Sequence, residues 1–164
     1  MRIAQIMLAR GFGGAERSFF DISETLASIG HTVLVIVDAR SVLLPRLAGN
    51  KRLLVIPIKC YGVWDVFAGY RIKRALAEFN AQIVHAHLAR SAHLGGKAAR
   101  ALQIPSLVKT HNLVNLKYYK SIDHFVTTTQ FQAKYLIKNG ISKPQITTIP
   151  NFTRLKPVDS VSSN

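Results

Sequence analysis

The sequence has 164 residues, which is enough for one domain with a real hydrophobic core and excludes a large modular protein. Hydrophobic residues make up 48% and charged residues 18%, so a disordered or low-complexity chain is excluded, and the single cysteine, Cys60, excludes an internal disulfide framework. The 22 lysines and arginines against 8 acidic residues give a net charge of +14, which predicts an anionic partner: phosphate, nucleic acid or an acidic membrane face.

The N-terminal apolar run begins like a signal sequence, but it ends at Arg10 without a small-residue cleavage site. We therefore interpret it as the first β-strand. No window approaches the roughly 18 to 20 apolar residues of a membrane-spanning helix, so the sequence predicts a domain that is soluble or lies on a surface, in the cytoplasm by default.

Short runs rich in valine, isoleucine, leucine and threonine have the length of strands. In chain order these expected strands are residues 3–8, 32–37, 53–57, 82–87, 106–109, 123–128 and, more weakly, 145–149. Amphipathic stretches lie between them, and the first carries Phe19, Ile22, Leu26 and Ile29 at helical spacing before Gly30.

This alternation of strand and helix, with strands that are almost continuously apolar, predicts a parallel sheet covered on both faces. The expected fold class is therefore α/β: a Rossmann-like parallel sheet of about seven strands with helices on both faces. In such sheets the carboxyl ends of the strands form the binding crevice, so the residues that follow each strand carry the functional information.

A glycine-rich turn, residues 11–16, leads from the first strand into the first helix. Gly13 and Gly14 let backbone N–H groups approach an anion closely, and the helix N-terminus favours negative charge. The turn departs from a dinucleotide fingerprint because Glu16 stands at the third glycine position, although Asp38 supplies the acid after the second strand. A tight structural turn, with Glu16 complementing the helix dipole, explains the motif equally well.

Histidines follow the fourth and fifth expected strands. His85 and His87 alternate to the same side, and His111 follows the next strand at the same edge, so three imidazoles are expected to converge. Zinc binding is one interpretation, but no carboxylate or cysteine stands at ligand spacing, and a hydrogen-bonded histidine near the core is more common. His111 differs from the others because Thr110 and Asn112 flank it with polar groups where a substrate would lie.

Residues 79–122 contain no acidic residue, and their densest part, residues 113–120, mixes aliphatic, aromatic and basic side chains. That mixture suits docking to anionic lipid headgroups, and a solvated loop partly packed on the core is the alternative. Trp64 allows the same two interpretations, and we expect it to pack in the core. The candidates for contact with an anionic membrane are Lys117, Tyr118, Tyr119 and Lys120.

Together these motifs resemble the N-terminal half of a GT-B glycosyltransferase, most closely the group 1 branch or family 4, which retains configuration at the sugar carbon. The resemblance covers roughly residues 1–153, and residues 154–164 are expected to form a linker or tail toward a missing C-terminal donor-binding domain. Gln82 and Phe152 stand where the family often has Asp and Gly. The motifs, in order at the strand exits, are residues 13–17, 83–87, 110–112 and 149–151.

The resemblance implies that the complete enzyme transfers a sugar from a nucleotide-diphosphate sugar to a glycan or lipid-linked acceptor, with no metal and no cofactor. Gly13 and Gly14 would approach the donor diphosphate, and His111 would be the catalytic residue. Family members often act in cell-envelope polysaccharide biosynthesis at the inner membrane face, which implies a cytoplasmic, peripheral location. This domain would mainly hold the acceptor, and alone it is expected to be inactive. The acceptor-binding candidates are Glu16, His87 and Asn112.

Two other functions fit the composition. A nucleic-acid-binding α/β module would explain the pI near 10.4, but the basic residues are scattered and no recognition signature is present, so no specific nucleic acid partner is expected. A non-catalytic α/β binding domain is the other alternative. It predicts that even a two-domain protein containing this chain turns over no sugar nucleotide.

Overall fold

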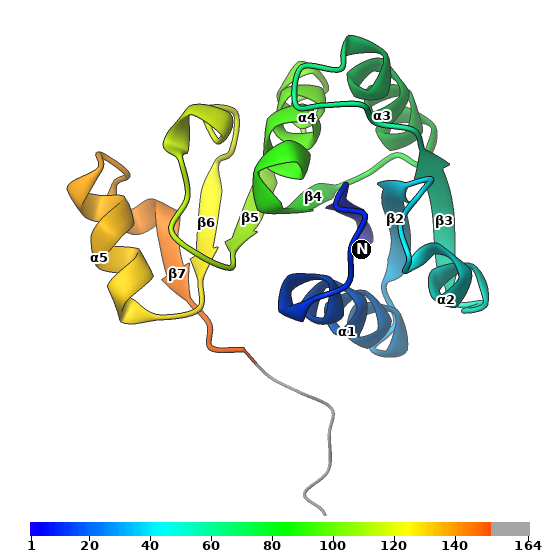
Figure 1. The fold of residues 1–164 in the computed structure, drawn as a ribbon, viewed down its shortest axis with the longest axis horizontal. Coiled ribbons are helices and arrows are strands. Elements are labelled where there is room, and N and C mark those ends of the chain that lie inside the picture. Colours follow the sequence, from blue (N-terminus) through cyan, green and yellow to red (C-terminus); the bar gives the residue numbers. More distant parts are fainter. Residues whose placement is uncertain (152–164) are drawn as a thin grey trace, which may run out of the picture.

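The computed structural model describes residues 1–151, and the expected tail over residues 154–164 lies outside them. Seven parallel strands form one sheet in the order β3-β2-β1-β4-β5-β6-β7, which confirms the Rossmann-like fold (Figure 1). The strands are β1 (Arg2–Met7), β2 (Thr32–Asp38), β3 (Leu53–Ile58), β4 (Ile83–His87), β5 (Ser106–Thr110), β6 (His124–Thr127) and β7 (Ile146–Thr148).

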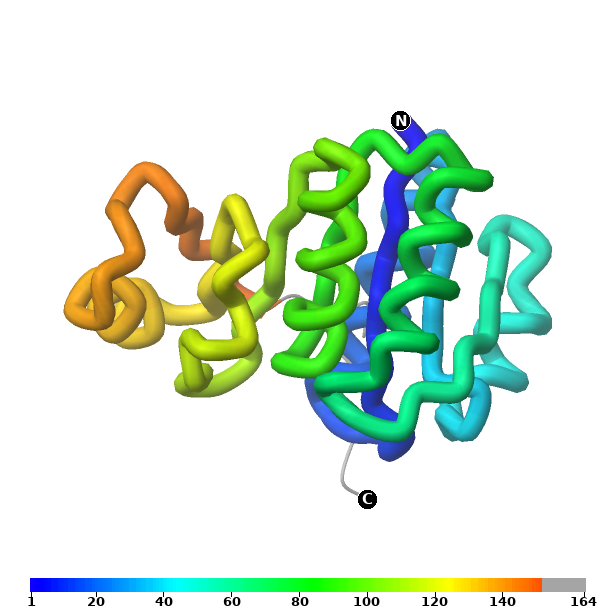
Figure 2. The backbone as a smooth tube through the Cα atoms, turned by 90° about the horizontal axis from the view of Figure 1, so that it is seen from above, coloured from blue at the N-terminus to red at the C-terminus, as the bar shows by residue number. Residues whose placement is uncertain are grey.

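Helices cover both faces of this sheet, as the sequence predicts. Figure 1 shows α3 and α4 above the sheet, α1 and α2 on the opposite face, and α5 beside β7 at the sheet edge. In the second view, α3 and α4 run alongside each other over the central strands (Figure 2). The helices are α1 (Gly14–Ser28), α2 (Leu44–Ala48), α3 (Val66–Glu78), α4 (Leu88–Ala101) and α5 (Gln130–Lys138), with single 3-10 turns at η1 (Leu116–Tyr118) and η2 (Lys143–Gln145).

The central strands divide their side chains between two hydrophobic clusters because successive residues of a strand point to opposite faces. In β1, Ala4 and Ile6 pack in the cluster under α3 and α4, whereas Met7 joins the cluster under α1. Gln5 therefore faces the α1 side of the sheet, between strands β2 and β4, and its side chain is fully buried.

The first helix ends one residue earlier than its apolar pattern indicates. The helical spacing predicts that Phe19 and Ile29 belong to one buried face of this helix. Phe19 is fully buried, but Ile29 is 64% exposed, so the prediction is wrong for Ile29. The cause is the end of α1 at Ser28, after which Gly30 takes a left-handed conformation with φ of 93°. Only glycine adopts that conformation without strain, and it turns the chain away from the sheet toward β2.

Trp64 is 67% exposed, so the expectation that it packs in the core is wrong. Asp65 caps α3 by accepting a hydrogen bond from the Ala68 backbone N–H, and the chain before that cap lies outside the sheet layers. The Trp64 ring instead lies edge-on against His93 of α4, with ring centroids 4.6 Å apart. Its indole is therefore a surface group between α3 and α4.

Close packing holds α4 against the centre of the sheet. A Cβ atom at Gly95 would lie 2.8 Å from Ile6 Cδ1, and one at Gly96 would lie 3.2 Å from the Ser121 carbonyl oxygen. Such short contacts leave no room for a larger residue, so the glycines let the helix approach β1 and the loop before β6. This approach fixes the turn between β4 and α4, where the candidate site begins.

Candidate active site

The polar residues gather at the carboxyl edge of the three central strands. In the register of the sheet Met7 pairs with His87, and His87 pairs with Lys109, so β1, β4 and β5 end at the same level. The glycine turn after β1 and His111 after β5 therefore emerge at one edge. A cavity of about 410 Å³ opens there, lined by Leu8, Ala9, Val63, Leu88, Ala89, Arg90, Ser91 and Tyr118.

The turn from β4 into α4 is strained at this cavity. Leu88 has φ of 65°, in the left-handed region, which costs an ordinary side chain about 1 kcal/mol or more. Arg90 follows in the first turn of α4, where its Nη1 donates to the Leu8 carbonyl at 3.0 Å. Arg90 thus brings a guanidinium to the cavity. In the sequence, the signal for Arg90 is its position three residues after the end of the fourth strand.

The glycine turn has a cap built into it. Glu16 is buried, and its Oε2 accepts from the Gly13 backbone N–H at 2.9 Å, which closes a capping box on α1. The carboxylate that was expected to bind an acceptor is thus engaged in the turn. Within residues 1–151, the N–H groups of Gly14 and Ala15 have no hydrogen-bond acceptor, as is usual for the first turn of a helix.

The fold does not need a glycine at position 14. A Cβ atom there would meet no atom within 4 Å, and the residue lacks the positive φ that would favour glycine. Because neither packing nor backbone conformation requires glycine here, the space beside Gly14 is open to a ligand.

Three imidazoles converge at this edge, which confirms the expectation from strand alternation. His87 Nδ1 lies 3.2 Å from His111 Nε2, and His87 Nε2 lies 3.1 Å from Gln5 Oε1. The rings of His85 and His87 are 4.3 Å apart. Phe19 of α1 contacts the other side of His87, with ring centroids 5.2 Å apart, so a single chain of contacts joins α1 to His111.

All three imidazoles are held neutral. Burial, together with the positive charge of Lys109, lowers the pKa of His85 to about 3 and that of His111 to about 4. Burial also lowers the pKa of His87 well below its usual value. At neutral pH the cluster therefore presents hydrogen-bonding nitrogens without positive charge.

The remaining expected site residues differ in their accessibility. His87 has no exposed surface, so direct contact with an acceptor is not available to it, and it contacts His111 instead. Asn112 is exposed beside His111. Tyr119 is only 4% exposed and packs against Phe125, so the expected contact of Tyr119 with a membrane is wrong.

The burial of Tyr119 has a local cause. The 3-10 turn η1 ends at Tyr118, and the chain then returns toward β6, which turns the Tyr119 ring into the cluster below α4. Burial raises the pKa of its phenol to about 12. Lys117 and Lys120 stay exposed on either side, and Tyr118 is half-buried at the cavity.

Asp38 is not available to a nucleotide ribose. Its carboxylate is fully buried and accepts from Arg40 Nε at 2.9 Å and from Arg10 Nε at 3.3 Å. Burial alone would raise its pKa, but the hydrogen bonds from Arg40 and Arg10 outweigh burial and lower it. Asp38, the acidic residue after the second strand that a dinucleotide site would need, is therefore engaged in structural ion pairs with Arg10 and Arg40.

No group of three or more His, Cys, Asp or Glu side chains within residues 1–151 is arranged to hold a metal ion. No helix in the same part of the chain has the length and apolar character to cross a bilayer.

Comparison with known families decides the class of the protein. The family model of Glycosyltransferase Family 4 matches residues 12–156. The chain belongs to glycosyltransferase family 4. The match includes Gly13, Gly14, the three histidines and Asn112, whereas Leu8 and Ala9 of the cavity precede it.

Solved structures share the fold. The chain is similar to Anabaena HepE in complex with UDP (15% identity, TM-score 0.76, covering 92% of this chain and 44% of that one). It is also similar to a glycosyltransferase from Rickettsia africae (24% identity, TM-score 0.73, covering 91% of this chain and 42% of that one). A third similar structure is the lipopolysaccharide outer core galactosyltransferase WaaB (16% identity, TM-score 0.71, covering 96% of this chain and 48% of that one). The chain spans less than half the length of these proteins. A search of curated protein sequences found no match.

Proposed function

We propose that this chain is the N-terminal, mainly acceptor-binding domain of a retaining glycosyltransferase that transfers a sugar from a nucleotide-diphosphate sugar to a glycan or lipid-linked acceptor. Family membership supports the transfer of a sugar, and the HepE complex with UDP supports a nucleotide donor. The observation that supports the proposal is that the glycine turn and the neutral His111 follow strands that end at the same edge of the sheet, where a cavity opens.

The glycine turn would receive the donor diphosphate. The N–H groups of Gly14 and Ala15 begin α1, where the helix dipole favours an anion, and Arg90 adds a positive charge at the cavity. As the bond between sugar and phosphate breaks, negative charge grows on the leaving phosphate, and donors fixed beforehand stabilise it. A second, donor-binding domain would hold the nucleotide from the other side.

His111 would contact the acceptor or the transferred sugar. Because its imidazole is neutral at pH 7, it offers a hydrogen bond to a sugar hydroxyl and adds no positive charge. Asn112 is exposed beside it and would bind the acceptor as well. We assign no nucleophile within this domain, since the leaving phosphate itself can take the acceptor proton.

Replacing Gly14 by alanine tests the diphosphate site. The added methyl group meets no atom within 4 Å and lies in the first turn of α1, so the free energy of unfolding should stay the same or rise. Calorimetry with UDP should show an affinity about tenfold lower, because the backbone can no longer approach the phosphates as closely.

Gly11→Ala is the matched control, because a Cβ atom at Gly11 also meets nothing within 4 Å but lies outside α1. UDP affinity in this variant should match that of the unaltered chain. Equal affinities for all three proteins would remove Gly14 from the diphosphate site.

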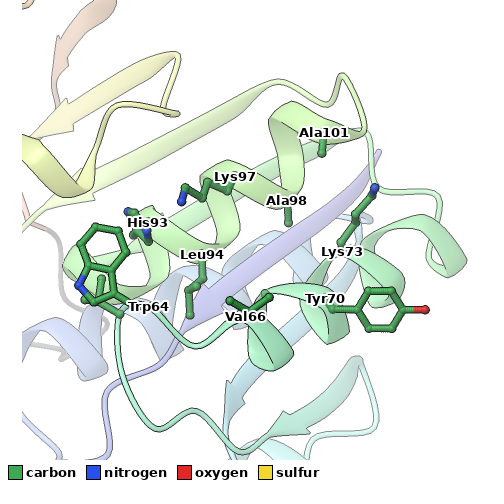
Figure 3. Close-up of a pocket in the computed structure, with 11 residues that line it drawn as sticks. Trp64, Val66, Tyr70, Lys73, His93, Leu94, Lys97, Ala98 and Ala101 are labelled. Carbon is green, nitrogen blue, oxygen red and sulfur yellow. The ribbon is translucent and has the colours of Figure 1, made fainter.

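The acceptor side would lie against an anionic membrane, at the inner face in the cytoplasm. A surface groove of about 340 Å³ between α3 and α4 combines apolar and basic side chains (Figure 3). Trp64 and Val66 are exposed on it, and Lys97 lies 5.7 Å from the Trp64 ring centroid. Tyr118 joins this groove to the cavity at the strand ends, because its ring is 6.5 Å from that of Trp64. We define the aromatic-basic surface as Trp64, Val66, Tyr70, Lys73 and Lys97.

Exposed indole and phenol groups beside lysines are suited to the headgroup region of a bilayer. The double variant Trp64→Ser, Val66→Ser should bind vesicles of phosphatidylglycerol and phosphatidylcholine at least tenfold more weakly, because two exposed apolar side chains lose their burial in the interface. Cosedimentation with the vesicles measures the partitioning.

The control is Phe131→Ser, Ile137→Ser, which removes two exposed apolar side chains from α5, far from this surface in sequence and on a different helix. It should bind vesicles as the unaltered chain does. Equal losses in both double variants would mean that binding is not localised to the aromatic-basic surface.

A further inference from the structure

Gln5 is a fully buried glutamine in the central strand β1. Its side chain lies between two histidines of β4: Nε2 is 3.1 Å from His85 Nδ1, and Oε1 is 3.1 Å from His87 Nε2. A buried amide is costly in a sheet core unless its donors and acceptors are paired, and an apolar side chain would fill the same place. The amide therefore calls for an explanation beyond packing.

The polarity of the amide fixes the direction of each hydrogen bond. An amide nitrogen donates and an amide oxygen accepts, so His85 Nδ1 accepts from Gln5, and His87 Nε2 donates to it. A neutral imidazole carries one N–H, so His87 Nδ1 is an acceptor. His111 Nε2, at 3.2 Å from that atom, must then be the donor.

We propose that Gln5 is a positioning residue that sets, through His87, which ring nitrogen of His111 carries the proton. His111 thereby keeps its proton on Nε2 and presents an unprotonated Nδ1 for a hydroxyl group of the acceptor or the transferred sugar. Within residues 1–151, Nδ1 of His111 has no hydrogen-bond partner, so this atom can accept a hydrogen bond from a substrate hydroxyl group. The inference deepens the proposed function and rests on the role that it gives to His111.

The surroundings of the chain preserve its direction. Phe19 of α1 closes one side of His87 with an apolar ring, and Lys109 of β5 adds the positive charge that disfavours a second proton on any of the histidines. At the far end, this assignment leaves the N–H of His85 Nε2 without an acceptor among the described residues, so no group beyond His85 sets the direction. Gln5 hydrogen-bonds to both His85 and His87, whereas His111 hydrogen-bonds to His87, so Gln5 is the group that links the two histidines of β4.

Nitrogen-15 NMR of the 164-residue chain, labelled at histidine, tests the proposal directly, because two-bond correlations to the ring protons distinguish a protonated from an unprotonated ring nitrogen. At pH 7 we expect His85, His87 and His111 each in a single form, with the proton on Nε2. A proton on Nδ1 of His111, or a mixture of both forms in the unaltered chain, would overturn the proposal.

The variant Gln5→Leu removes both hydrogen bonds and places an apolar side chain of similar size in the core. The preference of His111 for Nε2–H should then fall by roughly fivefold, the loss expected for one neutral hydrogen bond, and the minor form should become visible. Gln82→Leu is the matched control, since Gln82 is a glutamine outside the cluster that pairs with the Arg2 backbone N–H. It should leave the spectrum of His111 unchanged.

A double variant tests whether the effect passes through His87. His87→Phe alone should release His111, and adding Gln5→Leu to it should change His111 no further. A further change would show that Gln5 acts on His111 by another route and would contradict the proposal. These spectra need no sugar donor or acceptor, so they test the role of Gln5 even where sugar transfer is not detected. A failure of the Gln5 proposal is therefore distinguishable from a failure of the proposed function.

Discussion

Replacing His111 by alanine should lower the rate of sugar transfer by a factor of about 10² when this chain is joined to a donor-binding domain. The factor is that of one hydrogen-bonding group aimed at reacting atoms in a site that excludes water. The fold should survive, because His111 follows the end of β5 and its side chain contacts only the neighbouring ring of His87 through one hydrogen bond and ring stacking among the described residues. Initial rates with a labelled nucleotide sugar measure the change.

His31→Ala is the matched control, since His31 precedes β2 at the opposite edge of the sheet. It should transfer at the unaltered rate. Wild-type turnover by the His111→Ala protein would remove this residue from the site. No turnover by the unaltered two-domain protein would instead favour the non-catalytic binding domain. Because the pKa of His111 is lowered to about 4, protonation of this residue should not limit transfer between pH 6 and pH 8.

Acid should destabilise the domain well before its carboxylates are protonated. Burial lowers the pKa of His85 to about 3, against about 6.5 in the unfolded chain, so between these values the unfolded state binds more protons than the folded state. The free energy of unfolding therefore holds above pH 6.5 and falls as the pH drops toward 4. For His85 the loss at pH 5 is about 2 kcal/mol.

His87 and His111 add to this slope in the same direction, because their pKa values are also lowered by burial. Urea unfolding followed by far-ultraviolet circular dichroism at several pH values measures the slope. In His85→Phe the slope between pH 6.5 and pH 4.5 should be shallower than in the unaltered chain. A free energy of unfolding that stays constant from pH 7 to pH 5 would show that the imidazoles are not buried as described.

The sequence predicts the site where local rules determine position. Alternation along β4 places His85 and His87 on one side, and parallel topology brings His111 to the same edge, so their convergence follows without coordinates. Gly30 likewise marks the end of α1 through its conformational freedom. Fold class, strand order along the chain and the crevice edge all rest on such short-range patterns.

Other features depend on partners far apart in the chain. Gln5 looks like any strand residue until β4, about 80 residues later, places two histidines around its amide. Trp64 is exposed because the Asp65 cap starts α3 just after it, and Tyr119 is buried because the chain turns back after η1. The sequence predicts a buried Trp64 and an exposed Tyr119, the opposite of what the structure shows. Composition and burial preferences do not take the path of a loop into account, and that path decides the burial of both rings.

Mapping where UDP binds tests most directly whether the carboxyl edge of the sheet is the part of this domain that approaches the donor diphosphate. In amide NMR spectra of the chain titrated with UDP, the largest shifts should occur at Gly13, Gly14 and the residues around His111, with weaker effects at Arg90. Shifts confined to the groove between α3 and α4, or to the opposite edge near His31, would contradict the assignment of this edge as the place where a sugar nucleotide is bound.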